Sequence, residues 1–176
     1  GLQYFPVLPS GYTSTCSSDG QCGNYGPCWN TYCRACATTH YSTPAVGITT
    51  LPGGAGAIKS SLNATSPFGG TPTGPALTGA IQYATNWANT HPGHTVVVVL
   101  ATDGDPYSCT PSTIPEISNV AAAGKNQTPS VLTFVIGVGT SLANMNAIAA
   151  AGGTQKAYLV DTGGNVTQQF LQARNE

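Results

Sequence analysis

The sequence feature that most constrains the fold is an uninterrupted apolar run, Val96-Val-Val-Val-Leu-Ala101, within the stretch from Thr95 to Pro106. β-branched residues without polar alternation are typical of a strand buried on both faces, as in a parallel sheet covered by helices. The run stops at Thr102-Asp-Gly-Asp-Pro106, which has the composition of a turn. Ligands of open α/β sheets bind just beyond the carboxyl ends of the strands, so Asp103 and Asp105 are candidate metal or ligand residues. The alternative is a structural Asp-Gly turn whose carboxylates cap the neighbouring backbone.

Apolar segments with strand and helix periodicity alternate along most of the chain. We expect strands near residues 2–5, 45–51, 95–102, 131–138 and 157–160. We expect helices near residues 54–62, 75–88, 113–123, 141–151 and from about 165. Thr113-Ile-Pro-Glu116 has the pattern of a capping box, and Gly124 is expected to end that helix. This order predicts an α/β fold with a three-layer, doubly wound, mostly parallel sheet.

Composition limits the classes of partner. The chain has 176 residues, enough for a single domain over residues 1–176, and only 6% of them are charged. The formal net charge of -1 provides no basic face, so nucleic acid and acidic membrane surfaces are not expected as partners. No apolar run approaches the roughly 18 residues of a membrane span.

Five of the six cysteines lie between Cys16 and Cys36, inside the loop-like segment 7–44. The full set is Cys16, Cys22, Cys28, Cys33, Cys36 and Cys109. Their even number in a weakly charged chain favours disulfides and an oxidising compartment, so we expect the protein to be secreted or at the cell surface. A zinc site or a redox dithiol at Cys33-x-x-Cys36 is the alternative, although His40 provides no second paired motif for zinc. If all six cysteines pair, one of the cluster must reach Cys109.

A Gly/Pro/Thr-rich loop, Gly69-Gly-Thr-Pro-Thr-Gly-Pro75, leads into the helix expected from residue 75. It could cradle a phosphate, but it lacks the lysine and the spacing of a P-loop. A loop that offers hydroxyl groups, or a plain helix entry, is the preferred interpretation. Asn63, Asn126 and Asn165 begin Asn-x-Thr sequons, which permit glycosylation.

Three motifs in one order resemble the von Willebrand factor A domain family. They are Gly69-Gly-Thr-Pro-Thr73, Val99-Leu-Ala-Thr-Asp-Gly104 and Phe134-Val-Ile-Gly-Val-Gly139. The resemblance covers nearly all of residues 45–174, and Leu2-Gln-Tyr-Phe5 looks like the family's second strand. Residues 7–44 are then a cysteine-rich insertion within the domain, and their spacing looks like that of small inserts in secreted bacterial members.

In that family a Mg²⁺ or Mn²⁺ ion occupies the metal-ion-dependent adhesion site at the strand ends. The resemblance implies that Thr71 and Asp103 are ligands, with Thr73, Gly104 and Asp105 supporting them from around the site. Hard divalent cations take oxygen ligands and keep positions open for water or for a partner's carboxylate. The implied partner is therefore a protein that presents an acidic residue.

The chain departs from the family pattern at its first strand. The Asp-x-Ser-x-Ser motif, which provides the other metal ligands, does not occur in the sequence. We therefore expect the domain to be N-terminally incomplete, with the first strand and its helix supplied by another segment or by a neighbouring subunit, since unpaired sheet edges favour aggregation.

Three functions are compatible with these observations. The preferred one is an extracellular binding or adhesion module, in which a divalent metal assists a protein–protein contact. The alternative is a structural subunit of an extracellular filament or surface assembly, completed by a strand from another copy or segment. A metal-dependent enzyme using Asp103 and Asp105 is the least favoured, because the sequence contains no evident nucleophile–base pair or histidine cluster. We expect the protein not to be an enzyme.

Overall fold

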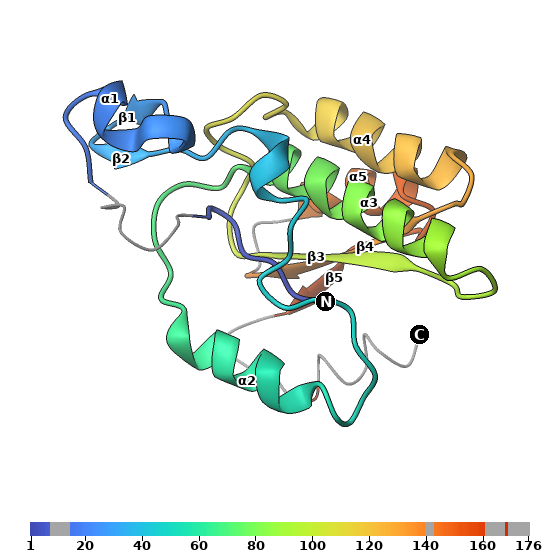
Figure 1. Ribbon diagram of the computed structural model, residues 1–176. Coiled ribbons are helices and arrows are strands. Elements are labelled where there is room, and N and C mark those ends of the chain that lie inside the picture. Colours follow the sequence, from blue (N-terminus) through green and yellow to red (C-terminus); the bar gives the residue numbers. More distant parts are fainter. Residues whose placement is uncertain (8–14, 140–142, 161–167, 169–176) are drawn as a thin grey trace. The chain divides into compact units, whose positions relative to one another are not determined.

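The structure is a computed structural model that describes residues 1–7, 15–139, 143–160 and 168. The chain divides into two compact units, and their helices and strands are labelled in Figure 1. The first unit contains residues 1–83 and 107–111, and the second contains residues 84–106 and 112–176. Each unit is described below by itself.

A parallel sheet organises the second unit. Its strands are β3 (Val97–Thr102), β4 (Leu132–Val138) and β5 (Tyr158–Val160), in the order β3-β4-β5 within the described residues. Val97 of β3 pairs with Leu132 of β4, and Ile136 of β4 pairs with Tyr158 of β5. The predicted parallel sheet is confirmed for these strands, and their carboxyl ends meet at one edge, where the turn from Thr102 to Pro106 begins.

The helices α4 (Ile114–Asn126) and α5 (Asn146–Ala151) contact each other and β4, so they cover the same face of the sheet. Their inner side chains are fully buried, namely Ile117 and Ala121 of α4 and Ile148 and Ala149 of α5. A short 3-10 helix, η3 (Ala143–Met145), precedes α5, and its Met145 is also buried.

The capping box predicted at Thr113 is present. The Thr113 hydroxyl accepts from the Glu116 amide, and the Glu116 carboxylate accepts from the Thr113 amide at 3.1 Å. These hydrogen bonds to the ionised carboxylate lower the pKa of Glu116. The helix runs through Gly124 to Asn126, so the prediction that Gly124 ends it was wrong. A glycine is tolerated this close to a helix end, and the chain becomes extended at Gln127, just before Thr128-Pro129.

The prediction that the valine run is buried on both faces is wrong for the described residues. Burial alternates along β3, with Val98 and Leu100 buried and Val97 and Val99 exposed by 40% and 56%. The face that carries Val98 and Leu100 is covered. The other face presents β-branched apolar side chains to solvent, so the three-layer arrangement is not established by these residues.

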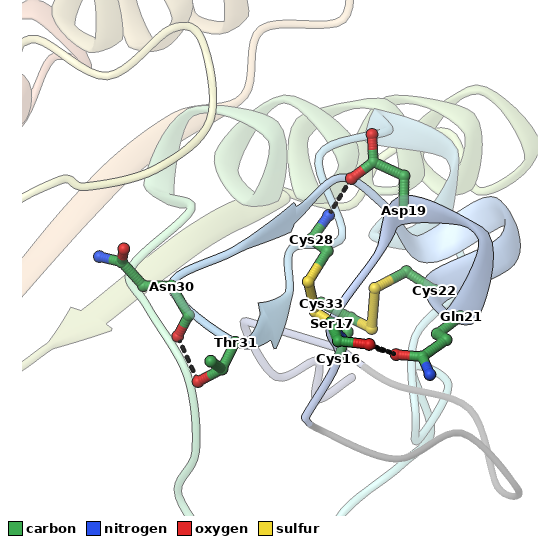
Figure 2. Close-up of a disulfide and its surroundings, with 9 residues drawn as sticks. All are labelled: Cys16, Ser17, Asp19, Gln21, Cys22, Cys28, Asn30, Thr31 and Cys33. Atoms are coloured by element: carbon green, nitrogen blue, oxygen red, sulfur yellow. Dashed lines mark hydrogen bonds between the residues drawn. A yellow bond between two sulfur atoms is a disulfide. The ribbon is translucent and has the colours of Figure 1, made fainter.

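Within the cysteine-rich segment, the described residues 15–44 contain two interleaved disulfides, Cys16–Cys28 and Cys22–Cys33 (Figure 2). The short elements that they join are α1 (Asp19–Cys22), η1 (Gly23–Tyr25), β1 (Cys28–Trp29), β2 (Tyr32–Cys33) and η2 (Thr38–His40). The strands β1 and β2 form an antiparallel hairpin, and the Asp19 carboxylate accepts from the Cys28 amide at 2.8 Å. The predicted structural disulfides are confirmed.

The third disulfide joins Cys36 to Cys109, which confirms that one cysteine of the cluster reaches position 109. Because Cys33 and Cys36 bond to different partners, the alternative of a redox dithiol or zinc pair at these two residues is wrong. No cysteine is free.

Two helices complete the first unit, α2 (Ala55–Ala64) and the part of α3 (Thr73–Thr90) up to Tyr83. The helix predicted near residues 75–88 is present as part of α3, and its Leu77 and Ile81 are buried. In contrast, α2 has no buried residue, and its Leu62 is 51% exposed.

The strands predicted at residues 2–5 and 45–51 reduce to one antiparallel bridge, between Leu2 and Val46. The Gln3 side chain explains why the first does not extend. Its amide donates to the His40 and Thr43 carbonyls, and its oxygen accepts from the Tyr4 amide, which is therefore not available to a strand partner. Residues 141 and 142, where the helix expected at 141–151 begins, lie outside the described residues. Of the helix expected from about residue 165, only residue 168 is described, and it is helical.

Candidate functional site

The turn after β3 is fixed by the Thr102 hydroxyl, which donates to the Gly104 carbonyl at 3.0 Å and accepts from the Gly104 amide at 3.3 Å. Thr102 is buried, whereas Asp103 is exposed. Within the part of the chain that the structure describes, the Asp103 carboxylate accepts no hydrogen bond. The turn therefore presents a carboxylate with free lone pairs at the carboxyl end of β3, as the sequence predicts for a ligand residue.

Asp105 is also exposed, but its carboxylate has a partner. One oxygen accepts from the side-chain amide of Asn144, in η3, at 2.9 Å. This contact joins the turn after β3 to the segment after β4 within the second unit. Asp105 thus has a local structural role, which is compatible with the supporting position that the sequence predicts for it.

Thr71 and Thr73 lie at the entry to α3, in the first unit. The Thr71 carbonyl accepts from the Thr73 amide and from the Tyr107 amide, both at 2.8 Å. The Thr73 hydroxyl is buried and lies 3.4 Å from the same carbonyl. The backbone of Thr71 is therefore held by several contacts, while its hydroxyl belongs to a partly buried residue.

Close packing explains a glycine at this entry. A Cβ at Gly74 would lie 2.0 Å from the Pro111 carbonyl oxygen, so only glycine permits the loop 107–111 to approach the first turn of α3. The Cys36–Cys109 disulfide and the amide of Tyr107 hold the same loop. The cysteine-rich segment, the loop 107–111 and the Thr71 backbone thus form one packed assembly.

The candidate ligands Thr71 and Asp103 belong to different units, so their joint site stays a prediction. Their chemistry suits a hard cation, because both offer oxygen atoms. Their number does not suffice, since one carboxylate and one hydroxyl leave most of the octahedral positions of Mg²⁺ without a protein ligand. These residues alone do not form a complete Mg²⁺ or Mn²⁺ site.

A different group of potential ligands gathers in the cysteine-rich segment. The sulfur atoms of Cys16, Cys22 and Cys33 lie within 4.8 Å of one another and are buried. All three are in disulfides, and a metal requires free thiolates, so this group does not bind a metal in the oxidised protein.

Sequence reasoning missed a cluster of aromatic side chains around Arg34, which we call the aromatic cluster (Trp29, Tyr32, Arg34 and Tyr107). The guanidinium carbon of Arg34 lies 5.3 Å from the centroid of the Trp29 ring and 4.8 Å from that of Tyr107. Tyr32 is the cross-strand partner of Trp29 in the β1–β2 hairpin, so both side chains project from the same face. A tryptophan and a tyrosine between closely spaced cysteines were the available signal.

The arginine also changes the acidity of a phenol in the aromatic cluster. The Arg34 Nη2 atom donates to the Tyr107 hydroxyl oxygen at 3.5 Å. This hydrogen bond and the positive charge of Arg34 lower the pKa of Tyr107, and a hydrogen bond from Trp29 acts in the same direction. The phenol is thus a hydrogen-bond acceptor for two neighbours on an exposed surface.

Comparisons with known proteins agree with this architecture. The sequence model of the family described as von Willebrand factor type A domain matches residues 38–173, more than half of the chain. A search of curated proteins and a search of solved structures found no match. Among the described residues, no helix is both long and apolar enough to cross a membrane.

Proposed function

The chain belongs to the von Willebrand factor type A domain family, and we propose that it is an extracellular binding module whose contact with a protein partner is assisted by Mg²⁺ or Mn²⁺. A role in protein interaction or adhesion is general for this family. The observation that carries the metal-dependent part is Asp103, an exposed carboxylate without a hydrogen-bond partner among the described residues, at the carboxyl end of β3. An acidic residue of the partner would fill an open position on the ion.

The metal ligands in this proposal are Asp103 and the hydroxyl of Thr71, with further oxygen ligands from a segment outside this sequence. Thr73, Gly104 and Asp105 keep the two ligand-bearing turns in shape through the hydrogen bonds described above. A location outside the cell is supported by three disulfides that join all six cysteines.

The test is a titration with Mn²⁺ followed by electron paramagnetic resonance, on this chain and on a version extended at its N-terminus. Asp103→Asn should weaken Mn²⁺ binding by about tenfold or more, because a charged ligand is lost. Asp19→Asn is the matched control, since its side-chain oxygen can still accept from the Cys28 amide. Equal Mn²⁺ binding by Asp103→Asn and the unchanged protein would overturn the metal site.

A second candidate function, a subunit of an extracellular assembly, is favoured by the state of β3. In the described residues β3 pairs only with β4, so its other edge offers unpaired backbone groups. The exposed Val97 and Val99 lie on the same strand. We propose that a strand from another segment or another copy pairs with this edge and that its helix covers the valines.

Sedimentation of the purified chain tests this second candidate. The chain should form concentration-dependent oligomers, and Val99→Lys should shift them toward monomer. Leu51→Lys, at an apolar position outside the sheet that is 69% exposed against 56% for Val99, should not. A cooperative, stable monomer at high concentration would refute assembly through β3.

A further inference from the structure

The aromatic cluster exposes an unusual amount of ring surface for a small segment. Trp29 is 56% exposed, Tyr32 42% and Tyr107 52%. Tryptophan, tyrosine and arginine are the residue types most enriched among the energetically dominant residues of protein interfaces. The aromatic cluster brings these three types together, with the rings exposed and Arg34 nearly buried beside them.

Covalent and backbone contacts hold the aromatic cluster in place before any partner binds. The disulfides Cys16–Cys28 and Cys22–Cys33 join the hairpin that carries Trp29 and Tyr32 to the preceding residues 16–22. Tyr107 is fixed by the hydrogen bond that its backbone amide donates to the Thr71 carbonyl and by the Cys36–Cys109 disulfide two residues later. A surface that is already ordered loses little conformational entropy on binding, which favours affinity.

The charge of Arg34 determines which partner fits. Arg34 is only 8% exposed, and no acidic side chain in the described segments forms an ion pair with it. A guanidinium has five N–H donors. The side-chain hydrogen bond described for Arg34 is the long one, at 3.5 Å, that it donates to the Tyr107 hydroxyl. A nearly buried cation without a counter-ion attracts a carboxylate, and the surrounding rings would exclude water from the pair.

We propose that the aromatic cluster is a docking site for a protein segment in which an acidic residue stands next to an apolar side chain. The carboxylate approaches Arg34, and the apolar side chain packs on the outer faces of Trp29 and Tyr107. A glycan could stack on the rings but would leave the positive charge uncompensated, so the charge favours the acidic peptide. The proposal rests on the protein-binding function above and names a contact surface for it that contains no metal ligand.

The test starts from a display library of random heptapeptides selected on the oxidised 176-residue chain. Selected peptides should carry Asp or Glu beside an aliphatic or aromatic residue. A consensus peptide and its matched amide version, with Asp or Glu changed to Asn or Gln, are then titrated with the indole fluorescence of a Trp87→Phe variant, in which Trp29 is the remaining tryptophan, as the readout. The acid-to-amide change should weaken binding by about tenfold, and added salt should weaken the acidic peptide more.

Variants locate the binding to the aromatic cluster. Trp29→Ala and Arg34→Gln, with affinity followed by fluorescence anisotropy of a labelled peptide, should each raise Kd by about tenfold or more. Leu51→Ala, at an apolar position that is 69% exposed, should leave Kd unchanged. Arg34→Lys keeps the charge but not the planar stacking group, so an intermediate Kd is expected. Non-reducing mass and circular dichroism show whether each variant is folded, and Trp29→Phe replaces Trp29→Ala if that variant is not.

Three outcomes would overturn the inference: selected peptides without acidic residues, unchanged affinity of Trp29→Ala and Arg34→Gln, or glycan-array binding that Trp29→Ala abolishes in place of peptide binding. The same experiments distinguish failure of this inference from failure of the proposed metal-dependent function. Loss of peptide binding with intact Mn²⁺ binding rejects the inference alone, whereas peptide binding in EDTA without any Mn²⁺ binding rejects the metal site alone.

Discussion

Removing the Cys36–Cys109 disulfide should destabilise the protein more than removing either of the other two. This bond joins residues separated by 73 positions, whereas Cys22–Cys33 spans 11 and Cys16–Cys28 spans 12. A disulfide stabilises the folded state mainly by restricting the unfolded chain, and the restriction grows with the length of the closed loop. The change is Cys36→Ala together with Cys109→Ala.

The magnitude follows from the loop lengths. Chain entropy assigns about 4.4 kcal/mol to a loop of the length closed by Cys36–Cys109 and about 2.8 kcal/mol to one of the length closed by Cys22–Cys33. Cys109 is buried, but alanine removes only a sulfur atom there, so the cavity adds little. We therefore expect the double alanine variant at 36 and 109 to lose about 1.7 kcal/mol more than the variant at 22 and 33.

Urea unfolding followed by tryptophan fluorescence measures both losses, with each variant compared with the unchanged protein by linear extrapolation. The variant at 36 and 109 should also show a larger dependence of the free energy on urea, because its unfolded chain is less compact. If it loses no more stability than the variant at 22 and 33, the argument from loop length is refuted for this protein.

Two further predictions concern the first unit. Arg34 lowers the pKa of Tyr107, so Arg34→Gln should move the absorbance titration of that phenol back toward its ordinary value, and an unmoved titration would contradict the Arg34 contact. In the unchanged protein, ionisation of this phenol contributes stability that is present above the unfolded pKa of about 10. That stability is lost as pH falls through the lowered folded pKa. Gly74→Ala should destabilise the fold by about 1–3 kcal/mol in thermal unfolding, because the new Cβ would meet the Pro111 carbonyl. The control is Gly56→Ala in α2, where the new Cβ has open space and should stabilise the fold by up to about 1 kcal/mol. Equal effects of the two changes would contradict the close approach at Gly74.

The parts of the fold that depend on local patterns could be predicted from the sequence. The strands β3 and β4 were indicated by apolar runs, and α4 by its periodicity and by the Thr113 capping box. The prediction of a strand at residues 2–5 was wrong because the Gln3 side chain forms hydrogen bonds with the His40 carbonyl and the Tyr4 amide. Side-chain hydrogen bonds of this kind leave no periodic signal in the sequence.

The candidate functional residues also differ in whether a local sequence pattern indicated them. Asp103 was predicted as a ligand because ligands of parallel sheets bind beyond the carboxyl ends of the strands, and that role stays a prediction; the structure shows that Asp103 is exposed. The aromatic cluster was not identifiable, since the contact between Arg34 and Tyr107 joins residues 73 positions apart. The joint role of Thr71 and Asp103 in metal binding remains a prediction.

The interleaving of Cys16–Cys28 with Cys22–Cys33 has a consequence for how the protein is made. Cys22 lies between Cys16 and Cys28 in the sequence, and Cys28 lies between Cys22 and Cys33. Neither bond therefore joins two cysteines that are consecutive along the chain. Cys16 is closer in sequence to Cys22, and Cys28 to Cys33, and shorter loops close at a lower entropy cost. Oxidation of the unfolded chain should therefore first produce mispaired isomers, and the native pattern should emerge by thiol–disulfide exchange, which a disulfide isomerase or a glutathione buffer would accelerate.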